Sequence, residues 1–235
     1  MHINTLSMAH PLEWLKMGWS IFINNPLQWI LILIVFFIIS IICNLIPLVG
    51  SLIFMLTSPA LMAGIFLATQ KSANGEVIEV KDLFSVVTDP NQRMPFIFLG
   101  VVVLIVNLLI MMIILLPMMG AVGLGYLSSD NGQMMSSMAA GAGIGSLLLI
   151  IPLTIVYLMA MIYAIPLMLF SNQGIKQALL LSLKASASNI LPMLLLSLIY
   201  FVLAIIAMIP MGLGFLILFP VTFGIVYASY KDIFS

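Results

Sequence analysis

Residues 17–70 read MGWSIFINNPLQWILILIVFFIISIICNLIPLVGSLIFMLTSPALMAGIFLATQ, and this stretch carries no charged side chain. A helix needs roughly 20 apolar residues to cross the hydrocarbon core of a bilayer. The stretch is therefore long enough for two crossings, which return the chain to the side from which it entered. Stretches of similar length recur at 94–175, where Asp130 is the only charged residue, and at 185–230. The spacing of the charges predicts six membrane spans.

The composition of the whole chain agrees with this prediction. Of its 235 residues, 64% are hydrophobic and only 6% are charged, whereas roughly 25% of the residues of an average soluble domain are charged. The N-terminal residues lack a basic region followed by an apolar segment and a cleavage site, so no signal peptide is expected. The single cysteine, Cys43, lies inside a predicted span, where we expect a small buried side chain and no intramolecular disulfide.

The predicted spans form one membrane domain over residues 1–235 with both termini on the same side. The six spans are expected at 27–47, 51–69, 95–117, 144–168, 191–210 and 213–230. All seven basic residues then lie on one side, which the positive-inside rule makes cytoplasmic. On the other side, tight turns are expected at 47–51 and 210–214, together with a longer loop over about 118–143. This loop is rich in Gly, Ser and Met, and is either flexible or partly re-entrant.

The odd-numbered spans share features that indicate an internal repeat. Each is entered past a proline and ends in a similar outer motif: IPLVG at 46–50, LPMMG at 116–120 and IPMG at 209–212. The entry prolines are Pro26, Pro95 and Pro192. We expect three parallel helical hairpins, related by an axis near the membrane normal, with approximate bounds 11–70, 78–170 and 173–231. The alternative is that apolar helices containing Pro and Gly resemble one another by composition alone.

Each predicted unit opens with an amphipathic segment. In residues 12–24, polar and apolar side chains fall on opposite helical faces: Glu13, Lys16, Ser20 and Asn24 against Leu12, Leu15, Trp19 and Phe22. Comparable segments precede the third span, around 80–87, and the fifth span, over 173–188. Such helices are expected to lie in the cytoplasmic headgroup layer.

The sequence offers little for catalysis. The only histidines, His2 and His10, lie in an N-terminal segment that we expect to be mobile, and no Asp or Glu falls inside a predicted span. No metal-ligand cluster, phosphate-binding loop or nucleophile–base–acid set is present, so no catalytic residue, metal or cofactor is predicted. Three acidic residues lie near one another, and we expect them to form a solvated loop surface together with two lysines. They are Glu76, Glu79 and Asp82, with Lys71 and Lys81.

Two sets of residues are therefore the candidates for binding. The first set is intramembrane and polar: Asn44, Ser58, Asn107, Tyr157 and Tyr200. Its members either form hydrogen bonds between helices or line a cavity for a substrate or lipid. The second set is the predicted cytoplasmic ring of cations: Lys16, Lys71, Lys81, Arg93, Lys176, Lys184 and Lys231. This ring either reflects topology alone or binds the phosphates of anionic lipid headgroups.

Three stretches carry a family resemblance: WLKMGWSIFINNPLQW at 14–29, IPLVGSL at 46–52 and FGIVYASYKDIF at 223–234. Together they resemble an uncharacterised family of six-span proteobacterial inner-membrane proteins. More distantly, the pattern is similar to the membrane domain of some glycerophosphodiester phosphodiesterases. The resemblance implies a multi-pass protein of the bacterial inner membrane with a link to lipids or the envelope. No soluble phosphodiesterase domain is present, so that activity is not carried over.

The sequence thus favours a non-enzymatic inner-membrane protein that binds membrane lipids or a membrane-protein partner, in envelope or lipid homeostasis. One alternative is an uncoupled channel or transporter for a neutral or lipidic solute. Another is an accessory subunit or assembly factor of a larger membrane complex. Met-rich and small-residue faces also favour a homo-oligomer, and nothing indicates a nucleic-acid partner.

Overall fold

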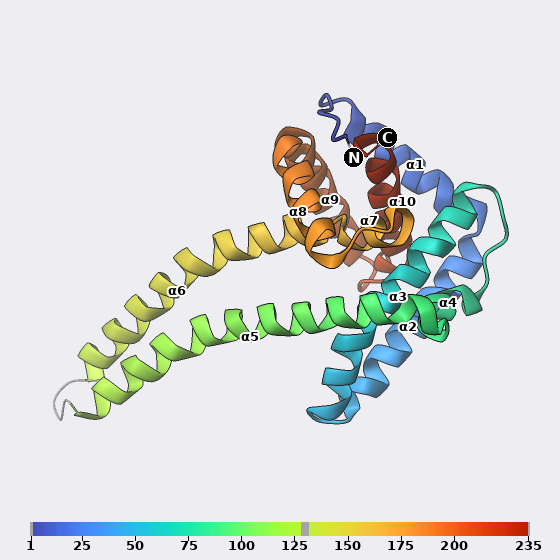
Figure 1. Ribbon diagram of the computed structural model, residues 1–235. Coiled ribbons are helices and arrows are strands. Elements are labelled where there is room, and N and C mark those ends of the chain that lie inside the picture. The colour runs from blue at the N-terminus through green and yellow to red at the C-terminus, as the bar shows by residue number, and fades with distance from the viewer. Residues whose placement is uncertain (1, 128–131, 235) are drawn as a thin grey trace. The chain divides into compact units, whose positions relative to one another are not determined.

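The computed structural model describes residues 2–127 and 132–234, and this part of the chain is mainly helical. It is 84% helix, and no strand is found among the described residues, which confirms the predicted all-α class. The helices are α1 (His10–Asn24), α2 (Pro26–Leu45), α3 (Val49–Ala73), the 3-10 helix η1 (Val80–Phe84), α4 (Ser85–Thr88), α5 (Pro90–Leu127), α6 (Gly132–Met161), α7 (Ala164–Ser171), α8 (Ile175–Ser188), α9 (Ile190–Met208) and α10 (Phe215–Ile233). Figure 1 labels the α-helices.

Six stretches of helix among the described residues are long and apolar enough to cross a membrane. They are Pro26–Leu45, Val49–Ala73, Pro90–Leu116, Leu148–Ser171, Ile190–Met208 and Phe215–Ile233. They agree with the six predicted spans to within a few residues, except that the third begins five residues early, at Pro90. The prediction of six span-length apolar helices is confirmed. Which side of a membrane each end occupies stays a prediction.

The tight turns expected between α2 and α3 and between α9 and α10 are present. Leu48 has a φ of 62°, and Met211 and Gly212 have φ values of 55° and 85°. These left-handed conformations reverse the chain within a few residues, and glycine adopts them without steric cost. Cys43, expected to be buried, is half-buried.

The predicted loop over 118–143 is mostly helical. Helix α5 continues to Leu127 and α6 begins at Gly132, whereas Asp130 lies outside the described residues. The chain has no proline between Pro117 and Pro152, and its Ala and Met residues favour helix. The absence of a helix breaker therefore outweighs the glycine content on which the prediction of a loop rested.

The described chain divides into two compact units. Unit 1 comprises residues up to Gly100 and from Met159 onward, and unit 2 comprises Val101–Leu158. These boundaries differ from those of the predicted repeats, and the three-fold repeat stays a prediction. Unit 2 contains parts of α5 and α6, whose described apolar side chains are largely exposed.

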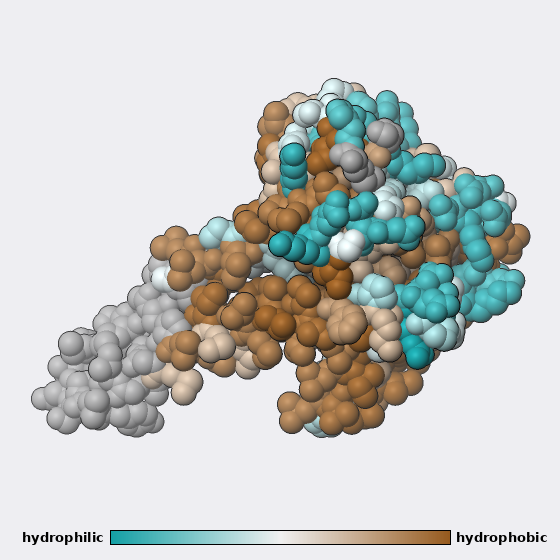
Figure 2. Space-filling view, viewed as in Figure 1, coloured by the Kyte–Doolittle hydropathy of each residue, from teal (hydrophilic) through white to brown (hydrophobic). Residues whose placement is uncertain are grey.

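The core of unit 1 is built around α3 and α10, the most deeply buried of the span-length helices. Their aromatic rings meet edge to face, with the Phe66 and Phe223 centroids 5.2 Å apart. Trp14 of α1 and Trp29 of α2 are fully buried in the same core. Figure 2 shows hydrophobic residues covering the α2–α3 hairpin, whereas hydrophilic residues gather around the connection between α3 and α4.

The N-terminal segment forms hydrogen bonds with the C-terminal part of the chain at Asn4 and Leu6, whereas the expected mobility around His2 stays a prediction. The Asn4 backbone N–H donates to the Ile233 carbonyl (2.9 Å). The Leu6 backbone N–H donates to the Asn189 side-chain oxygen (2.8 Å), and the Asn189 side-chain nitrogen donates to the Asn4 carbonyl (3.0 Å). One buried amide thus satisfies two backbone groups of the segment and fixes it against the C-terminal helices.

Helices precede two of the spans where amphipathic segments were expected. In α1, Trp14 and Ile21 are buried against the bundle, while Leu12 and Trp19 are about half exposed. α1 therefore packs into unit 1 with one face and leaves a second apolar face open. Before the third span, the chain forms only the short η1 and α4. The location of these segments in a headgroup layer stays a prediction.

Candidate functional site

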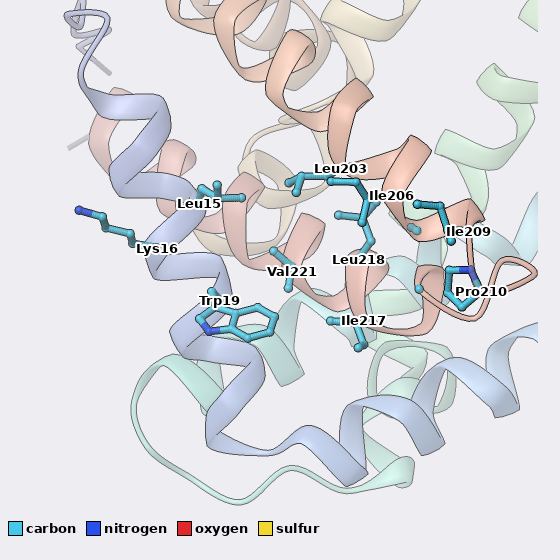
Figure 3. A pocket seen from close by; sticks show the side chains of 12 residues that line it. Leu15, Lys16, Trp19, Leu203, Ile206, Ile209, Pro210, Ile217, Leu218 and Val221 are labelled. Atoms are coloured by element: carbon cyan, nitrogen blue, oxygen red, sulfur yellow. The ribbon is translucent and has the colours of Figure 1, made fainter.

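A groove of about 680 Å³ lies among α1, α9 and α10 of unit 1. In Figure 3, side chains of α10 lie between those of α1 on one side and those of α9 on the other. The residues that line the groove are Leu15, Lys16, Trp19, Leu203, Ile206, Ala207, Ile209, Pro210, Gly214, Ile217, Leu218 and Val221.

Two close backbone approaches position the walls of this groove. α1 crosses α10 at Gly18 and Gly224, where a Cβ added to Gly224 would lie 2.7 Å from the Gly18 Cα. α9 meets α10 at Ala207 and Gly214, where a Cβ added to Gly214 would lie 2.5 Å from the Ala207 Cα. Any larger residue would separate these helices, because packed interiors leave no room for extra atoms. Glycine therefore sets how closely α1 and α9 approach α10.

The lining of the groove is suited to binding an apolar chain. Most of it is aliphatic, with the Trp19 indole as the only aromatic ring and Lys16 as the only charged residue. In Figure 3 the Lys16 ammonium points away from the groove, so its carbon stem contributes the lining. No carboxylate, hydroxyl, thiol or imidazole is among the residues that line the groove.

Two further cavities lie elsewhere in unit 1. One of about 620 Å³ is a hollow along α8 that includes Lys176, Leu180 and Lys184. Another, of about 460 Å³, is lined by the start of α5 and the connection between α7 and α8. Amide side chains line this third cavity, among them Asn91 and Asn172.

Lys71, one of the seven predicted headgroup cations, is used inside the fold. Its ammonium lies 2.6 Å from the Asp82 carboxylate, whose side chain is only 5% exposed. Asp82 also accepts a hydrogen bond from the Glu79 backbone N–H (2.9 Å). The expectation of a solvated acidic face is therefore wrong for Asp82, because the first turn of η1 buries it against α3 and Lys71 neutralises it.

Two other predicted cations also have intramolecular partners. The Lys81 ammonium lies 2.8 Å from the Glu79 carboxylate, and both side chains are exposed. This hydrogen bond and the negative charge of Glu79 raise the pKa of Lys81. The Lys231 ammonium lies 5.5 Å from the centre of the Tyr227 ring, a cation–π contact.

The remaining four cations form no ion pair among the described residues. They are Lys16, Arg93, Lys176 and Lys184, of which Arg93 is half-buried and the lysines are exposed. The structure thus divides the predicted cations into three with a partner inside the fold and four without an ion pair among the described residues.

Asn107 has partners for its amide within unit 2. Its side-chain nitrogen donates to the Val103 carbonyl one turn earlier (2.8 Å). Its side chain is also the hydrogen-bond partner of the Tyr157 hydroxyl on α6. Asn107 and Tyr157, predicted separately as polar candidates, are therefore brought together as a contact between two helices.

The other intramembrane polar candidates form hydrogen bonds mainly to their own helices. Asn44 donates to the Ser40 carbonyl (2.8 Å) and Ser58 to the Met55 carbonyl (3.3 Å). Tyr200 accepts from Thr222 of α10 (3.2 Å). None of these polar candidates is among the residues that line the three cavities described above. These polar groups are satisfied by hydrogen bonds within apolar helices. A role for them in lining a further cavity stays a prediction.

A set of buried polar contacts near the C-terminus was not predicted from the sequence. The Trp14 indole N–H donates to the Asp232 carboxylate (2.7 Å), and the Tyr163 hydroxyl donates to Ser229 (3.0 Å). The signal was the run YASYKD at 227–232, which is unusually polar for the end of a predicted span and the two residues after it. Residues 227–230 of this run are buried in unit 1, which explains why the least apolar of the six helices is also among the most buried.

The fold defines a multi-pass helical membrane protein, supported by its six span-length helices. Comparison of the chain with protein-family models, with curated proteins and with solved structures finds no match in any of the three. The described residues include no group of three or more His, Cys, Asp or Glu side chains that could hold a metal ion. The resemblance to six-span inner-membrane proteins therefore stays a prediction.

Proposed function

We propose that this protein is a non-enzymatic membrane protein that binds a membrane lipid, with an acyl chain of the lipid in the groove among α1, α9 and α10. The observation that carries the proposal is the apolar lining of a groove of about 680 Å³ between two span-length helices. A bacterial inner-membrane location rests on the family resemblance alone, and fractionation of the native cell would test it.

The physical reason is that a hollow between membrane helices must be filled. Side chains that line an empty space lose dispersion contacts, which an acyl chain restores. Each methylene group that leaves water for an apolar site contributes about 0.8 kcal/mol. In a bilayer the tail is already in hydrocarbon, so retention of one lipid depends on how well it fits. Trp19 and Lys16 fit the expected position of a headgroup, because indole rings and lysine stems are favoured at the membrane interface.

The test is to fill the groove with a larger side chain. Leu203 lines the groove, so Leu203→Trp should occupy the space of the acyl chain. Leu198→Trp is the matched control, because Leu198 is on the same helix, is 61% exposed and does not line the groove. Native mass spectrometry of protein purified in mild detergent measures how much phospholipid is retained.

We expect Leu203→Trp to weaken lipid retention by about tenfold, equivalent to roughly 1.4 kcal/mol, and Leu198→Trp to leave it unchanged. Equal retention by the two variants, with equal thermal midpoints, would reject the groove as the lipid site. Copurification of a stoichiometric protein in place of lipid would favour the partner-binding alternative.

A further inference from the structure

The outward face of α8 carries two lysines with an exposed leucine between them. Lys176, Leu180 and Lys184 follow one another at intervals of four residues, so they lie on one helical face. Leu180 is 57% exposed and both lysines are exposed. All three line the hollow of about 620 Å³. We call this surface the α8 face.

The opposite side of α8 is fixed to the rest of unit 1, so the α8 face has a defined orientation. Ser182 and Ser186 are buried, and both donate to the Met159 carbonyl, at 2.8 Å and 3.1 Å. Ser182 also accepts the Tyr163 backbone N–H (3.0 Å). Because these contacts hold the buried side, Lys176 and Lys184 are kept on the outer side.

The charge of the α8 face is not neutralised within the described chain. α8 is the one described helix with two basic residues and no carboxylate, and neither lysine forms an ion pair among the described residues. The two lysine Cα atoms are separated by eight residues, or about 12 Å along the helix axis. Flexible side chains of this length can approach the oxygens of one phosphate group or of two neighbouring ones.

We propose that the α8 face binds the phosphate of an anionic membrane phospholipid. A lipid is favoured over a soluble anion because Leu180 lies exposed between the two lysines, where a soluble phosphate would gain nothing from it. α9, one of the span-length helices, begins at Ile190, directly after α8. Basic residues beside a membrane helix attract anionic headgroups in this way. The inference rests on the proposed function, lipid binding, and adds a preference for headgroup charge.

The experiment compares binding of phosphatidylglycerol, which is anionic, with binding of phosphatidylcholine, which is zwitterionic. Both lipids are titrated into the purified full-length chain in mild detergent and followed by native mass spectrometry. The test variant is Lys176→Gln with Lys184→Gln. The matched control is Lys81→Gln with Lys231→Gln, which removes the same charge from lysines that have partners within the fold.

We expect the test variant to bind phosphatidylglycerol about 30-fold more weakly, which corresponds to two contributions of about 1 kcal/mol. The affinity of the test variant for phosphatidylcholine should stay within about twofold of that of the unmodified protein, a difference of roughly 0.4 kcal/mol. The affinity of the control variant for phosphatidylglycerol should stay within the same range. Leu180→Ala should weaken phosphatidylglycerol binding. Inorganic phosphate added as a competitor should act on this variant as it does on the unmodified protein.

Three results would overturn the inference: equal losses in the test and control variants, no loss in either, or an equal loss for both lipids. Should the test variant be unstable, the unmodified protein still decides the question. Raising the salt concentration must then weaken phosphatidylglycerol binding more than phosphatidylcholine binding. The two proposals can fail separately. Unchanged lipid retention in Leu203→Trp would reject the groove as the acyl-chain site, whereas the lysine variants test only the preference for an anionic headgroup.

Discussion

Substitution of Gly224 by alanine tests the contact on which the groove depends. The added Cβ would lie 2.7 Å from the Gly18 Cα and 3.1 Å from the Gly18 carbonyl oxygen. Both are backbone atoms that cannot rotate away. Ordinary contact begins at 3.4 Å, so α1 must move from α10 by about 0.7 Å. Trp19 is adjacent to Gly18, and the wall of the groove that it forms must move too.

The expected free-energy cost separates into two opposing parts. Overpacking of this size typically costs about 1–3 kcal/mol. Alanine in place of glycine inside a helix returns up to about 1 kcal/mol through its higher helix propensity. Gly145→Ala is a control for the second part, because Gly145 is also helical and a Cβ added there meets nothing within 4 Å. The difference between Gly224→Ala and Gly145→Ala is therefore the cost of the clash.

The assay is thermal unfolding in detergent, at one scan rate for all variants, because the unfolding of such proteins is often irreversible. Gly224→Ala should unfold roughly 2–12 °C below Gly145→Ala, on the scale of a chain of this length. Gly18→Ala should behave similarly. The double variant of Gly18 and Gly224 should cost less than the sum of the two, since one displacement of α1 relieves both clashes.

Equal midpoints for Gly224→Ala and Gly145→Ala would refute the reasoning. That outcome would mean that α1 does not contact the backbone of α10 at Gly224. α1 would then not form a wall of the groove. Retained lipid provides the second measurement. Gly224→Ala should reduce lipid retention, because it displaces Trp19, whereas Gly145→Ala should not.

The remaining predictions concern the N-terminal segment and the buried ion pair. Asn189→Ala removes the side-chain hydrogen bonds to Leu6 and Asn4, so hydrogen exchange of the Leu6 amide should accelerate, by an amount equivalent to roughly 1 kcal/mol. Unchanged exchange would show that other contacts hold the segment. Lys71→Met leaves the Asp82 carboxylate buried without its cation and should lower stability by about 1–3 kcal/mol. Adding Asp82→Asn should recover part of this loss, and a fully additive double variant would contradict the pairing.

The sequence identified the number and type of the helices because the signal for membrane spans is local. An uncharged run such as 17–70 is too apolar for water and long enough for two crossings. Proline and glycine near the ends of the runs placed the turn at Leu48 and the turn at Gly212. The same local reasoning misjudged 118–143, where glycine was given more weight than the lack of a helix breaker.

The candidate site depended on contacts between residues far apart in the chain. Lys71 and Lys176 are equivalent as isolated cations, yet Lys71 is paired with Asp82 and Lys176 has no ion pair among the described residues. Likewise, Gly18 and Gly224 are separated by most of the chain, and nothing local indicates that their backbones touch.

By itself, the sequence determined that this chain has six apolar helices long enough to cross a membrane, in which the few charged residues lie near the helix ends. The cost of placing a charge in hydrocarbon acts on each residue separately, so it can be deduced from one segment at a time. Only the tertiary structure decided which cations are paired within the fold and where a groove is open. These properties depend on the packing of α1, α9 and α10 against one another, and packing is a property of pairs of surfaces that no single segment contains.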